Sequence, residues 1–283
     1  MPLPDPREDM ELMRNAAVAA GILATSFFRR DVKHWTKDNA SPVTEADLAV
    51  DRYLEKTLTH ARPDYGWLSE ETADDPQRLD AERVFIVDPI DGTRGFMRGD
   101  DNWSISMAVV ENGEPIAGLV YVPIRDELYE AIIGDGVLIN GHPLERRQHH
   151  VTEPVIPAPG AVHRALAEAG LDYVRGPHTP SLAYRLVQVA TGVFDATAAR
   201  RGAQDWDIAA AALILSESGV IMEDVCAGPL RFNGADPRHG ALMVSAVDGL
   251  AGPLREALKQ VYGCPDDSAV DASIHAKADK DII

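Results

Sequence analysis

The fold is organised around one stretch of sequence, Arg83-Val84-Phe85-Ile86-Val87-Asp88-Pro89-Ile90-Asp91-Gly92-Thr93-Arg94-Gly95-Phe96. Its apolar residues Val84–Val87 predict a short strand that is buried on both faces. Two aspartates follow, where Pro89 holds Asp88 extended and Gly92 permits a turn. The pattern therefore predicts two carboxylates at a strand end, with backbone N–H groups just beyond them. Carboxylates bind hard cations such as Mg²⁺ and N–H groups bind phosphate, so a metal and phosphate site is expected here.

The composition is that of an acidic globular protein. The chain has 283 residues, of which 45% are hydrophobic and 25% charged, and its formal net charge is −18. A chain of this length can bury the core of one large domain or two smaller ones. The negative charge argues against a protein that binds nucleic-acid polymers. It would also repel a phosphorylated substrate unless cations offset it locally, which agrees with a metal site.

Other sequence features concern the compartment. The N-terminus lacks the basic and apolar segments of a signal peptide, and no apolar run approaches the ~20 residues that span a membrane. The only cysteines are Cys226 and Cys264, and their number and spacing predict neither a zinc site nor a disulfide framework. We therefore expect a cytoplasmic protein that does not associate with membranes.

Periodicity predicts an α+β domain over residues 1–148. Apolar residues three and four positions apart predict an amphipathic helix over Glu8–Arg29, and the polar segment that follows it, Asp31–Ser41, is predicted to be an irregular loop. A second helix should begin after Thr44, with Asp47 completing a capping box. The rest of this half alternates between apolar and polar residues, which predicts an antiparallel sheet.

The second half, residues 149–262, alternates between strand and helix patterns and predicts a smaller α/β unit. Its proline-containing first segment, His149–Pro159, is the predicted linker between two domains. One predicted helix, Trp206–Ser218, begins beside two aspartates. The tail, residues 263–283, has no apolar period and is predicted to be disordered.

Several known site types do not fit the aspartate-rich turn. Haloacid-dehalogenase-type phosphatases carry two aspartates two positions apart, but the residue two before Asp91 is Pro89. An EF-hand loop needs alternating oxygen ligands, which Pro89 and Ile90 interrupt. Walker, Gly-x-Ser-x-Gly and His-Glu-x-x-His motifs are absent from the sequence. What remains is a metal-dependent hydrolase whose site consists of carboxylates.

Asp88–Thr93 resembles the signature of the inositol monophosphatase family. Further segments match the family in the same order: Lys37, Pro42–Asp47, Ser69–Glu71 and Asp205–Ala211. The resemblance covers essentially the whole chain before the tail. It implies a layered α-β-α-β-α architecture similar to that of the sugar phosphatases, a homodimer and sensitivity to Li⁺.

The resemblance also implies a centre of two or three Mg²⁺ ions. The implied ligands are Glu70, Asp88, Asp91, Asp207 and the backbone carbonyl of Ile90. Such ions would screen the charge of a phosphate ester, lower the pKa of a water molecule and stabilise the leaving alkoxide. Because Asp207 lies in the second half of the sequence, the active site is expected between the two halves.

The remaining catalytic roles are carried over from the same resemblance. Thr93 and Asp47 match the pair that activates the nucleophilic water, and Glu70 would help to orient that water through a third ion. Glu71 matches a supporting position beside the ligands. The N–H groups of Gly92 and Thr93 would bind phosphate oxygens.

The sequence departs from the inositol-preferring pattern at two places. Arg94-Gly95 follows the signature where Thr-Asn is expected, and Arg200-Arg201 stands where a glutamate commonly precedes Asp207. We expect Arg200 and Asp207 to contact the substrate. An arginine pair at this position suits a substrate with a second anionic group. These arginines could equally offset the negative charge of the protein.

These departures favour a 3′(2′),5′-bisphosphate nucleotidase acting on 3′-phosphoadenosine 5′-phosphate. Inositol-1-monophosphatase is the first alternative and histidinol-phosphatase the second; fructose-1,6-bisphosphatase shares the general signature. A different class is a non-catalytic regulatory relative that binds a phosphorylated ligand. The complete set of ligand and water-activating residues favours an enzyme over a regulator.

Overall fold

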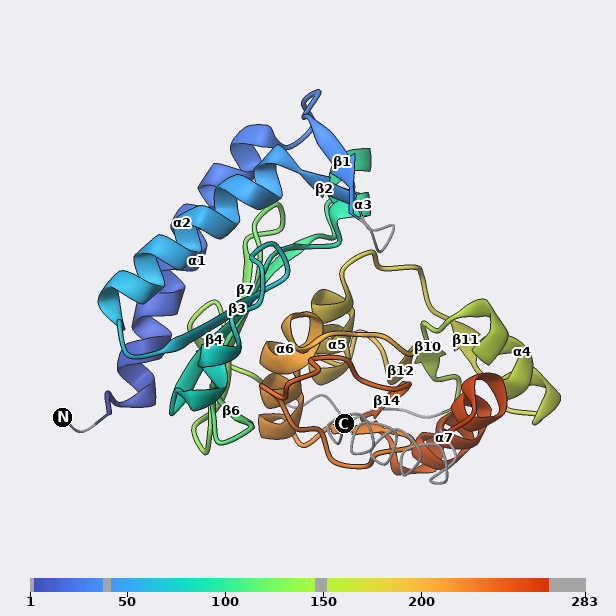
Figure 1. Cartoon of the computed structure of the whole chain (residues 1–283). Coiled ribbons are helices and arrows are strands. Elements are labelled where there is room, and N and C mark those ends of the chain that lie inside the picture. The colour runs from blue at the N-terminus through green and yellow to red at the C-terminus, as the bar shows by residue number, and fades with distance from the viewer. Residues whose placement is uncertain (1–2, 38–41, 146–151, 265–283) are drawn as a thin grey trace, which may run out of the picture.

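The computed structural model describes residues 3–37, 42–145 and 152–264 (Figure 1). Its helices are α1 (Pro6–Phe27), α2 (Glu45–Ala61), α3 (Thr93–Arg98), α4 (Gly160–Glu168), α5 (Leu182–Ala190), α6 (Asp205–Glu217) and α7 (Asp248–Tyr262), with a 3-10 turn at Pro76–Asp80. Its strands are β1 (His34–Thr36), β2 (Pro42–Thr44), β3 (Gly66–Ser69), β4 (Arg83–Asp91), β5 (Ser104–Glu111), β6 (Glu114–Val122), β7 (Glu127–Ile132), β8 (Gly136–Ile139), β9 (His142–Pro143), β10 (Val155–Ile156), β11 (Val174–Arg175), β12 (Ala196–Ala199), β13 (Ile221–Asp224) and β14 (Leu242–Ser245).

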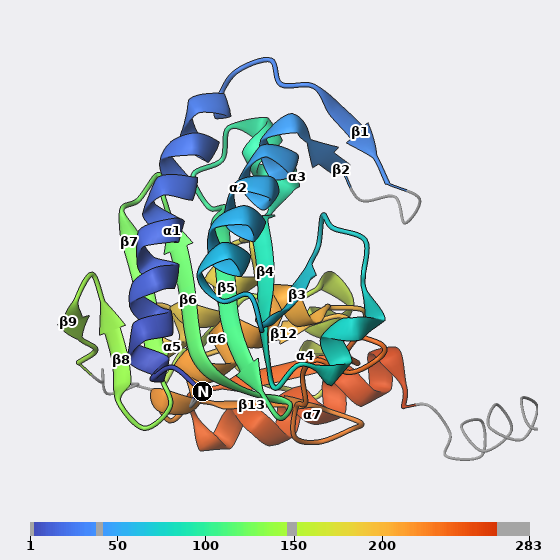
Figure 2. The same ribbon diagram turned by 60° about the vertical axis from the view of Figure 1, so that its left-hand side comes forward.

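The elements stack in five layers, seen nearly edge-on in Figure 1 and from the side of α1 and α2 in Figure 2. Helices α1 and α2 cover one face of the sheet β3-β4-β5-β6-β7-β8-β9. Helices α5 and α6 cover the other face and also pack against the sheet β12-β14-β13, whose far side is covered by α4 and α7. The α-β-α-β-α order expected from the sequence is confirmed.

The strand pairing differs from the prediction in two details. Strand β3 pairs with β4 in parallel, so the large sheet is mixed rather than wholly antiparallel. The connection between them passes through the 3-10 turn instead of a tight hairpin, which allows a parallel return. In the second half, helices and strands alternate as expected, but β14 pairs antiparallel with both β12 and β13.

Two local predictions were wrong. In the predicted irregular loop, His34–Thr36 forms a short antiparallel pair with Pro42–Thr44. Cys226 and Cys264 form a disulfide bond with their Cα atoms 5.4 Å apart, although we predicted no disulfide. The pairing depends on tertiary structure, because α7 crosses the small sheet and returns the end of the chain to the turn after β13. Most of the predicted tail lies outside the described residues.

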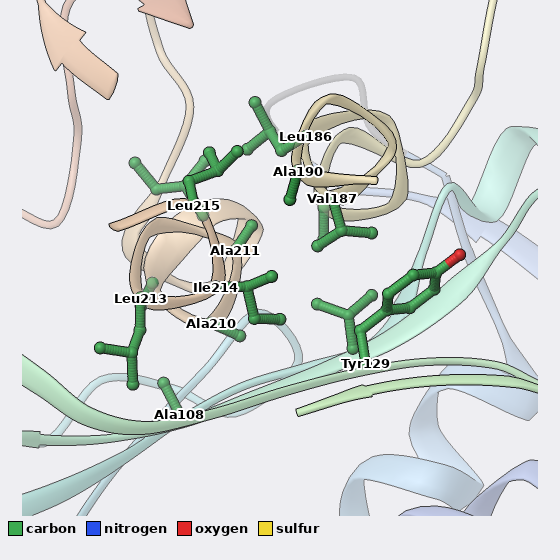
Figure 3. Packing of buried hydrophobic residues seen from close by; sticks show 14 of the residues in the cluster. Ala108, Tyr129, Leu186, Val187, Ala190, Ala210, Ala211, Leu213, Ile214 and Leu215 are labelled. Atoms are coloured by element: carbon green, nitrogen blue, oxygen red, sulfur yellow. The ribbon is translucent and has the colours of Figure 1, made fainter. Parts of the chain in front are cut away.

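Helix α6 is apolar on nearly every side because it lies between the two sheets. Figure 3 shows Ala210, Leu213 and Ile214 of this helix packing toward the large sheet and toward α5. Gly118 on β6 makes the close approach possible: a Cβ atom there would lie 2.8 Å from the carbonyl oxygen of Ala210. This packing fixes the start of α6 near the end of β4. One hydrophobic cluster thus contains residues of both halves, and the division into two domains near residue 148 stays a prediction.

No helix among residues 3–37, 42–145 and 152–264 is long and apolar enough to cross a membrane.

Candidate metal and phosphate site

The end of β4 turns two carboxylates to the same side. Every residue of β4 is buried, and its pairing with β5 is regular up to Asp88, which lies opposite Ser106. The register then shifts before Asp91, which lies opposite Ser104. Residues three apart in a regular strand point to opposite faces, so the irregularity at Pro89 is what brings the two aspartates together.

Asp207 reaches the same place from the other half of the sequence. It occupies the third position of α6, and its Oδ2 accepts a hydrogen bond from the backbone N–H of Gln204 (2.7 Å) in a capping arrangement. One carboxylate oxygen from each of Asp88, Asp91 and Asp207 lies within 4.8 Å of the others. Asp207 thus lies beside the two aspartates of the signature.

The electrostatics of this group fit a divalent cation. Burial, followed by the charges of neighbouring carboxylates, raises the pKa of Asp88 well above its usual range. Burial and the charge of Asp91 do the same to the pKa of Asp207. Two buried acids and one partly buried acid at such distances are unfavourable as free anions, and a hard cation with oxygen ligands is the partner that relieves the repulsion. The donor set therefore fits Mg²⁺.

Asp91 is anchored by the start of α5. Its Oδ2 accepts hydrogen bonds from the hydroxyl of Ser181 (2.6 Å) and the backbone N–H of Ala183 (2.7 Å). Ser181, the N-cap of α5, also bonds to the hydroxyl of Ser104 (2.9 Å). Burial raises the pKa of Asp91 to about 6, although these hydrogen bonds oppose the rise. The arrangement fixes one oxygen of Asp91 against α5.

Gly92 is required by both its backbone conformation and its surroundings. Its φ of 94° lies in the left-handed region, where a side chain is disfavoured. A Cβ atom on Gly92 would also lie 2.9 Å from the backbone nitrogen of Ser181. The chain turns here into α3, and Gly92 and Thr93 line the same pocket as the aspartates. This is where the sequence predicted phosphate contacts.

Thr93 and Asp47, which the resemblance implied as a pair, are in contact. The hydroxyl of Thr93 lies 3.1 Å from Asp47 Oδ1 and 3.2 Å from the carbonyl oxygen of Ile90. The other oxygen of Asp47 accepts the backbone N–H of Thr44 (2.8 Å), which confirms the predicted capping box. Burial raises the pKa of Asp47 to about 6. Asp47 is therefore both a helix cap and the acceptor beside Thr93.

Glu70 lies in the pocket but is engaged by a lysine. Lys37 Nζ contacts Glu70 Oε1 at 3.0 Å and Glu71 Oε1 at 2.8 Å. Burial alone would lower the pKa of Lys37, but the charge of Glu70 and the hydrogen bond to Glu71 raise it overall. Burial raises the pKa of Glu71 to about 7. Glu70 thus stands beside the three aspartates rather than within their close group.

The pocket has a volume of about 510 Å³ and carries both signs of charge. Glu70, Asp88, Asp91 and Asp207 supply the acidic lining, and Arg94, Arg98, Arg185 and Arg200 the basic lining. Arg200 was predicted as a substrate residue, and it does line the pocket. Arg185 was not predicted as a site residue. It interrupts the apolar pattern of α5, and a charged residue in such a pattern is expected on the exposed face of the helix.

Among the described residues, Arg185 has an unusual hydrogen-bonding state. Its Nε is buried and has no hydrogen-bond partner in the part of the chain that the structure describes, and its Nη2 lies 3.4 Å from the carbonyl oxygen of Ala198. Burial lowers the pKa of Arg185, which the charge of Asp91 partly offsets. A guanidinium placed in this way is suited to bind an anion that enters the pocket.

Comparison with known proteins assigns the family. The model of the inositol monophosphatase family matches residues 5–261. The chain belongs to this family. It is 30% identical to the inositol-1-monophosphatase of Rhizobium meliloti, over 79% of this chain and 85% of that relative. It is also 30% identical to the 3′(2′),5′-bisphosphate nucleotidase CysQ of Aggregatibacter actinomycetemcomitans, over 77% of this chain and 84% of that relative.

Solved structures agree with the family assignment. The crystal structure of the extragenic suppressor protein suhB from Bartonella henselae is similar with a TM-score of 0.77 and 27% identity, over 89% of this chain and 98% of that protein. Membership of the family indicates a phosphatase of small phosphate esters. The relatives differ in the substrates for which they are named, so the family alone does not select one.

Proposed function

We propose that this protein hydrolyses a small phosphate monoester by means of a Mg²⁺-activated water molecule. The observation that carries the proposal is the group of Asp88, Asp91 and Asp207, of which the first two are buried and the third partly buried, and whose carboxylate oxygens lie within 4.8 Å of one another. The group lines a pocket of about 510 Å³, which is large enough for a sugar or nucleoside phosphate. A regulatory protein that only bound a phosphorylated ligand would not need three acids so close together.

In this proposal two or three Mg²⁺ ions are held by Glu70, Asp88, Asp91, Asp207 and the carbonyl oxygen of Ile90. When bound, the ions would lower the pKa of the attacking water and neutralise charge on the phosphate and the leaving oxygen. Glu71 would support Glu70 through their shared contact with Lys37.

Thr93 and Asp47 would provide the route for the proton. The Thr93 hydroxyl donates toward Asp47, so its oxygen can accept a hydrogen bond from a water molecule in the pocket. The proton of that water would pass to Thr93 as the Thr93 proton passes to Asp47. Because burial raises the pKa of Asp47 to about 6, it is better suited to accept a proton near neutral pH than an ordinary aspartate.

The basic lining favours a substrate with a second anionic group. Arg185 lies on α5 and Arg200 directly after β12, whereas the three aspartates come from β4 and α6 and Glu70 directly follows β3. One phosphate of the substrate would lie at the metal ions and a second anionic group at the arginines. We therefore favour 3′-phosphoadenosine 5′-phosphate, with inositol 1-phosphate and then histidinol phosphate as the alternatives.

Phosphate release from matched substrates tests the proposal. We expect hydrolysis that requires Mg²⁺ and a higher kcat/KM for 3′-phosphoadenosine 5′-phosphate than for adenosine 3′-phosphate, which lacks the second phosphate. Inositol 1-phosphate, histidinol phosphate and fructose 1,6-bisphosphate complete the series. Equal rates for the two adenosine compounds would refute the second anionic subsite, and activity unaffected by EDTA would refute the metal.

Three further properties are proposed, the first two from the family and the third from the sequence features described above. We expect inhibition by Li⁺, assembly as a homodimer and a cytoplasmic location. Titration of the phosphatase activity with LiCl and the molar mass measured in solution by light scattering test the first two. Fractionation of the source cells tests the third.

A further inference from the structure

We propose that Asp51, which does not line the pocket, is a positioning residue that holds Glu70 in place for the metal. The inference rests on the proposed metal centre. Asp51 lies one helical turn after Asp47 on α2, so the two acids face the same side of the helix. Asp47 reaches Thr93, and Asp51 reaches the segment that carries Glu70. One helix thus organises two parts of the site.

The contacts of Asp51 bracket the glutamate pair. Its Oδ1 accepts the hydroxyl of Ser69, and its Oδ2 accepts the hydroxyl of Thr72 (2.7 Å). These two residues stand on either side of Glu70 and Glu71 in the sequence. Asp51 is 4% exposed and Ser69 is 2% exposed, so the bond between them is shielded from water, whereas Thr72 is partly buried. Both oxygens of one rigid helix residue are therefore used to fix both ends of a two-residue segment.

The segment Glu70–Glu71 needs such support because it lies beyond the end of strand β3. The backbone N–H of Glu70 still donates to Val87 on β4 (3.3 Å), but β3 ends at Ser69. Lys37 holds the two glutamates by their side chains, yet this contact would compete with a metal ion for Glu70. Asp51 instead fixes the backbone on either side of Glu70 and Glu71 and does not contact the carboxylates of these two residues. It can therefore keep Glu70 near the aspartates whether or not Lys37 releases it.

Direct measurement of Mg²⁺ binding tests the inference. Isothermal titration of the metal-free protein with Mg²⁺ gives an affinity that does not depend on the substrate or on turnover. For Asp51→Ala we expect the affinity of one Mg²⁺ site to fall on the order of tenfold, as is typical when a residue that orients a ligand is removed. The Mg²⁺ concentration for half-maximal phosphate release should rise in parallel, whereas kcat at saturating Mg²⁺ should change little.

Two further variants make the result unambiguous. Thr72→Val removes one of the two hydroxyls that Asp51 binds, with little change in shape, and leaves Asp51 in place. It should weaken Mg²⁺ binding by a smaller factor than Asp51→Ala. It also provides the test if Asp51→Ala does not fold. Glu55→Gln, one turn further along α2, removes the same charge outside the site and should leave Mg²⁺ binding unchanged.

Mg²⁺ affinity that is unchanged in folded Thr72→Val and Asp51→Ala would overturn the role of Asp51. An equal loss in Glu55→Gln would also overturn it, because the effect would then be one of net charge. If the unmodified protein binds no Mg²⁺, the metal centre itself is refuted. Failure of this inference is thus distinct from failure of the proposed function.

Discussion

The carboxylate of Asp91 and the hydroxyl of Ser181 form a 2.6 Å hydrogen bond between residues 90 positions apart in the sequence. The bond joins the end of β4 to the N-cap residue of α5. The same oxygen of Asp91 also accepts the backbone N–H of Ala183. A candidate metal ligand therefore also fixes how the two halves of the chain meet at the pocket.

Gly92→Ala should disturb this junction. The new Cβ would be 2.9 Å from the backbone nitrogen of Ser181 and would sit on a residue with φ of 94°. We expect a loss of about 1–3 kcal/mol in the free energy of unfolding, from strain of this kind. Urea unfolding of the metal-free protein measures it. Gly134→Ala is the control, because Gly134 has a similarly positive φ and a Cβ atom there would meet nothing within 4 Å. If Gly92→Ala costs no more stability than Gly134→Ala, contact with Ser181 does not matter.

Asp91→Asn should abolish Mg²⁺-dependent activity and yet stabilise the metal-free protein at pH 7.5. The amide oxygen of asparagine can still accept the bonds from Ser181 and Ala183, while the repulsion from neighbouring acids is removed. Because burial raises the pKa of Asp91 from 3.8 to about 6, the gain is at most about 3 kcal/mol. Thermal unfolding in EDTA measures it. A lower Tm than that of the unmodified protein would contradict the idea that the acid cluster is strained without metal.

The stabilising effect of Mg²⁺ should depend on pH. Burial raises the pKa values of Asp47 and Asp91 to about 6. Their contribution to the stability of the metal-free protein is thus complete below about pH 4 and is lost as the pH rises through about 6. Mg²⁺ would bind the deprotonated carboxylate of Asp91, a proposed ligand, and so offset the loss there, whereas Asp47 is not a proposed ligand.

The rise in Tm on adding Mg²⁺ should therefore be larger at pH 8 than at pH 5. Differential scanning calorimetry at both pH values, with and without EDTA, measures it. Asp91→Asn serves as the control and should show a smaller difference between the two pH values. An equal rise at both would contradict the assignment of the raised pKa values to the metal site.

Arg185→Gln should alter specificity more than chemistry. The glutamine keeps a polar side chain on α5 but removes the charge that would meet a second anionic group. We expect KM for 3′-phosphoadenosine 5′-phosphate to rise by about 10-fold or more, on the scale of a lost charge-assisted hydrogen bond. KM for adenosine 3′-phosphate should change little. An equal rise for both substrates would indicate that Arg185 supports the fold of the pocket instead.

The local patterns in the sequence predicted much of the fold. The apolar stretch of β4, the capping box at Thr44 and the amphipathic face of α1 each depend on neighbouring residues, and each is present. The parallel pairing of β3, the Cys226–Cys264 bond and Arg185 at the pocket depend on which distant segments meet. No local pattern carries that information.

In the candidate site, too, the sequence predicted the residues of the motifs but not the distant residues that hold them. The family motif named the acids, and the structure brings Asp88, Asp91 and Asp207 together. The partners that hold these groups, Ser181 for Asp91 and Asp51 for the Glu70 segment, come from helices whose approach is set by core packing. The sequence therefore did not predict the hydrogen bonds that these partners make.

The most direct test of the central claim is Mg²⁺-dependent release of inorganic phosphate from 3′-phosphoadenosine 5′-phosphate by the unmodified protein and by Asp207→Asn. Asp207 joins the acids of β4 from the other half of the chain, and asparagine preserves its size. We predict steady phosphate release with Mg²⁺, none with EDTA, and a loss of at least about 100-fold in kcat for the variant, as expected when a metal ligand is removed. Unchanged turnover in Asp207→Asn, or turnover in EDTA, would contradict a metal centre built from these three aspartates.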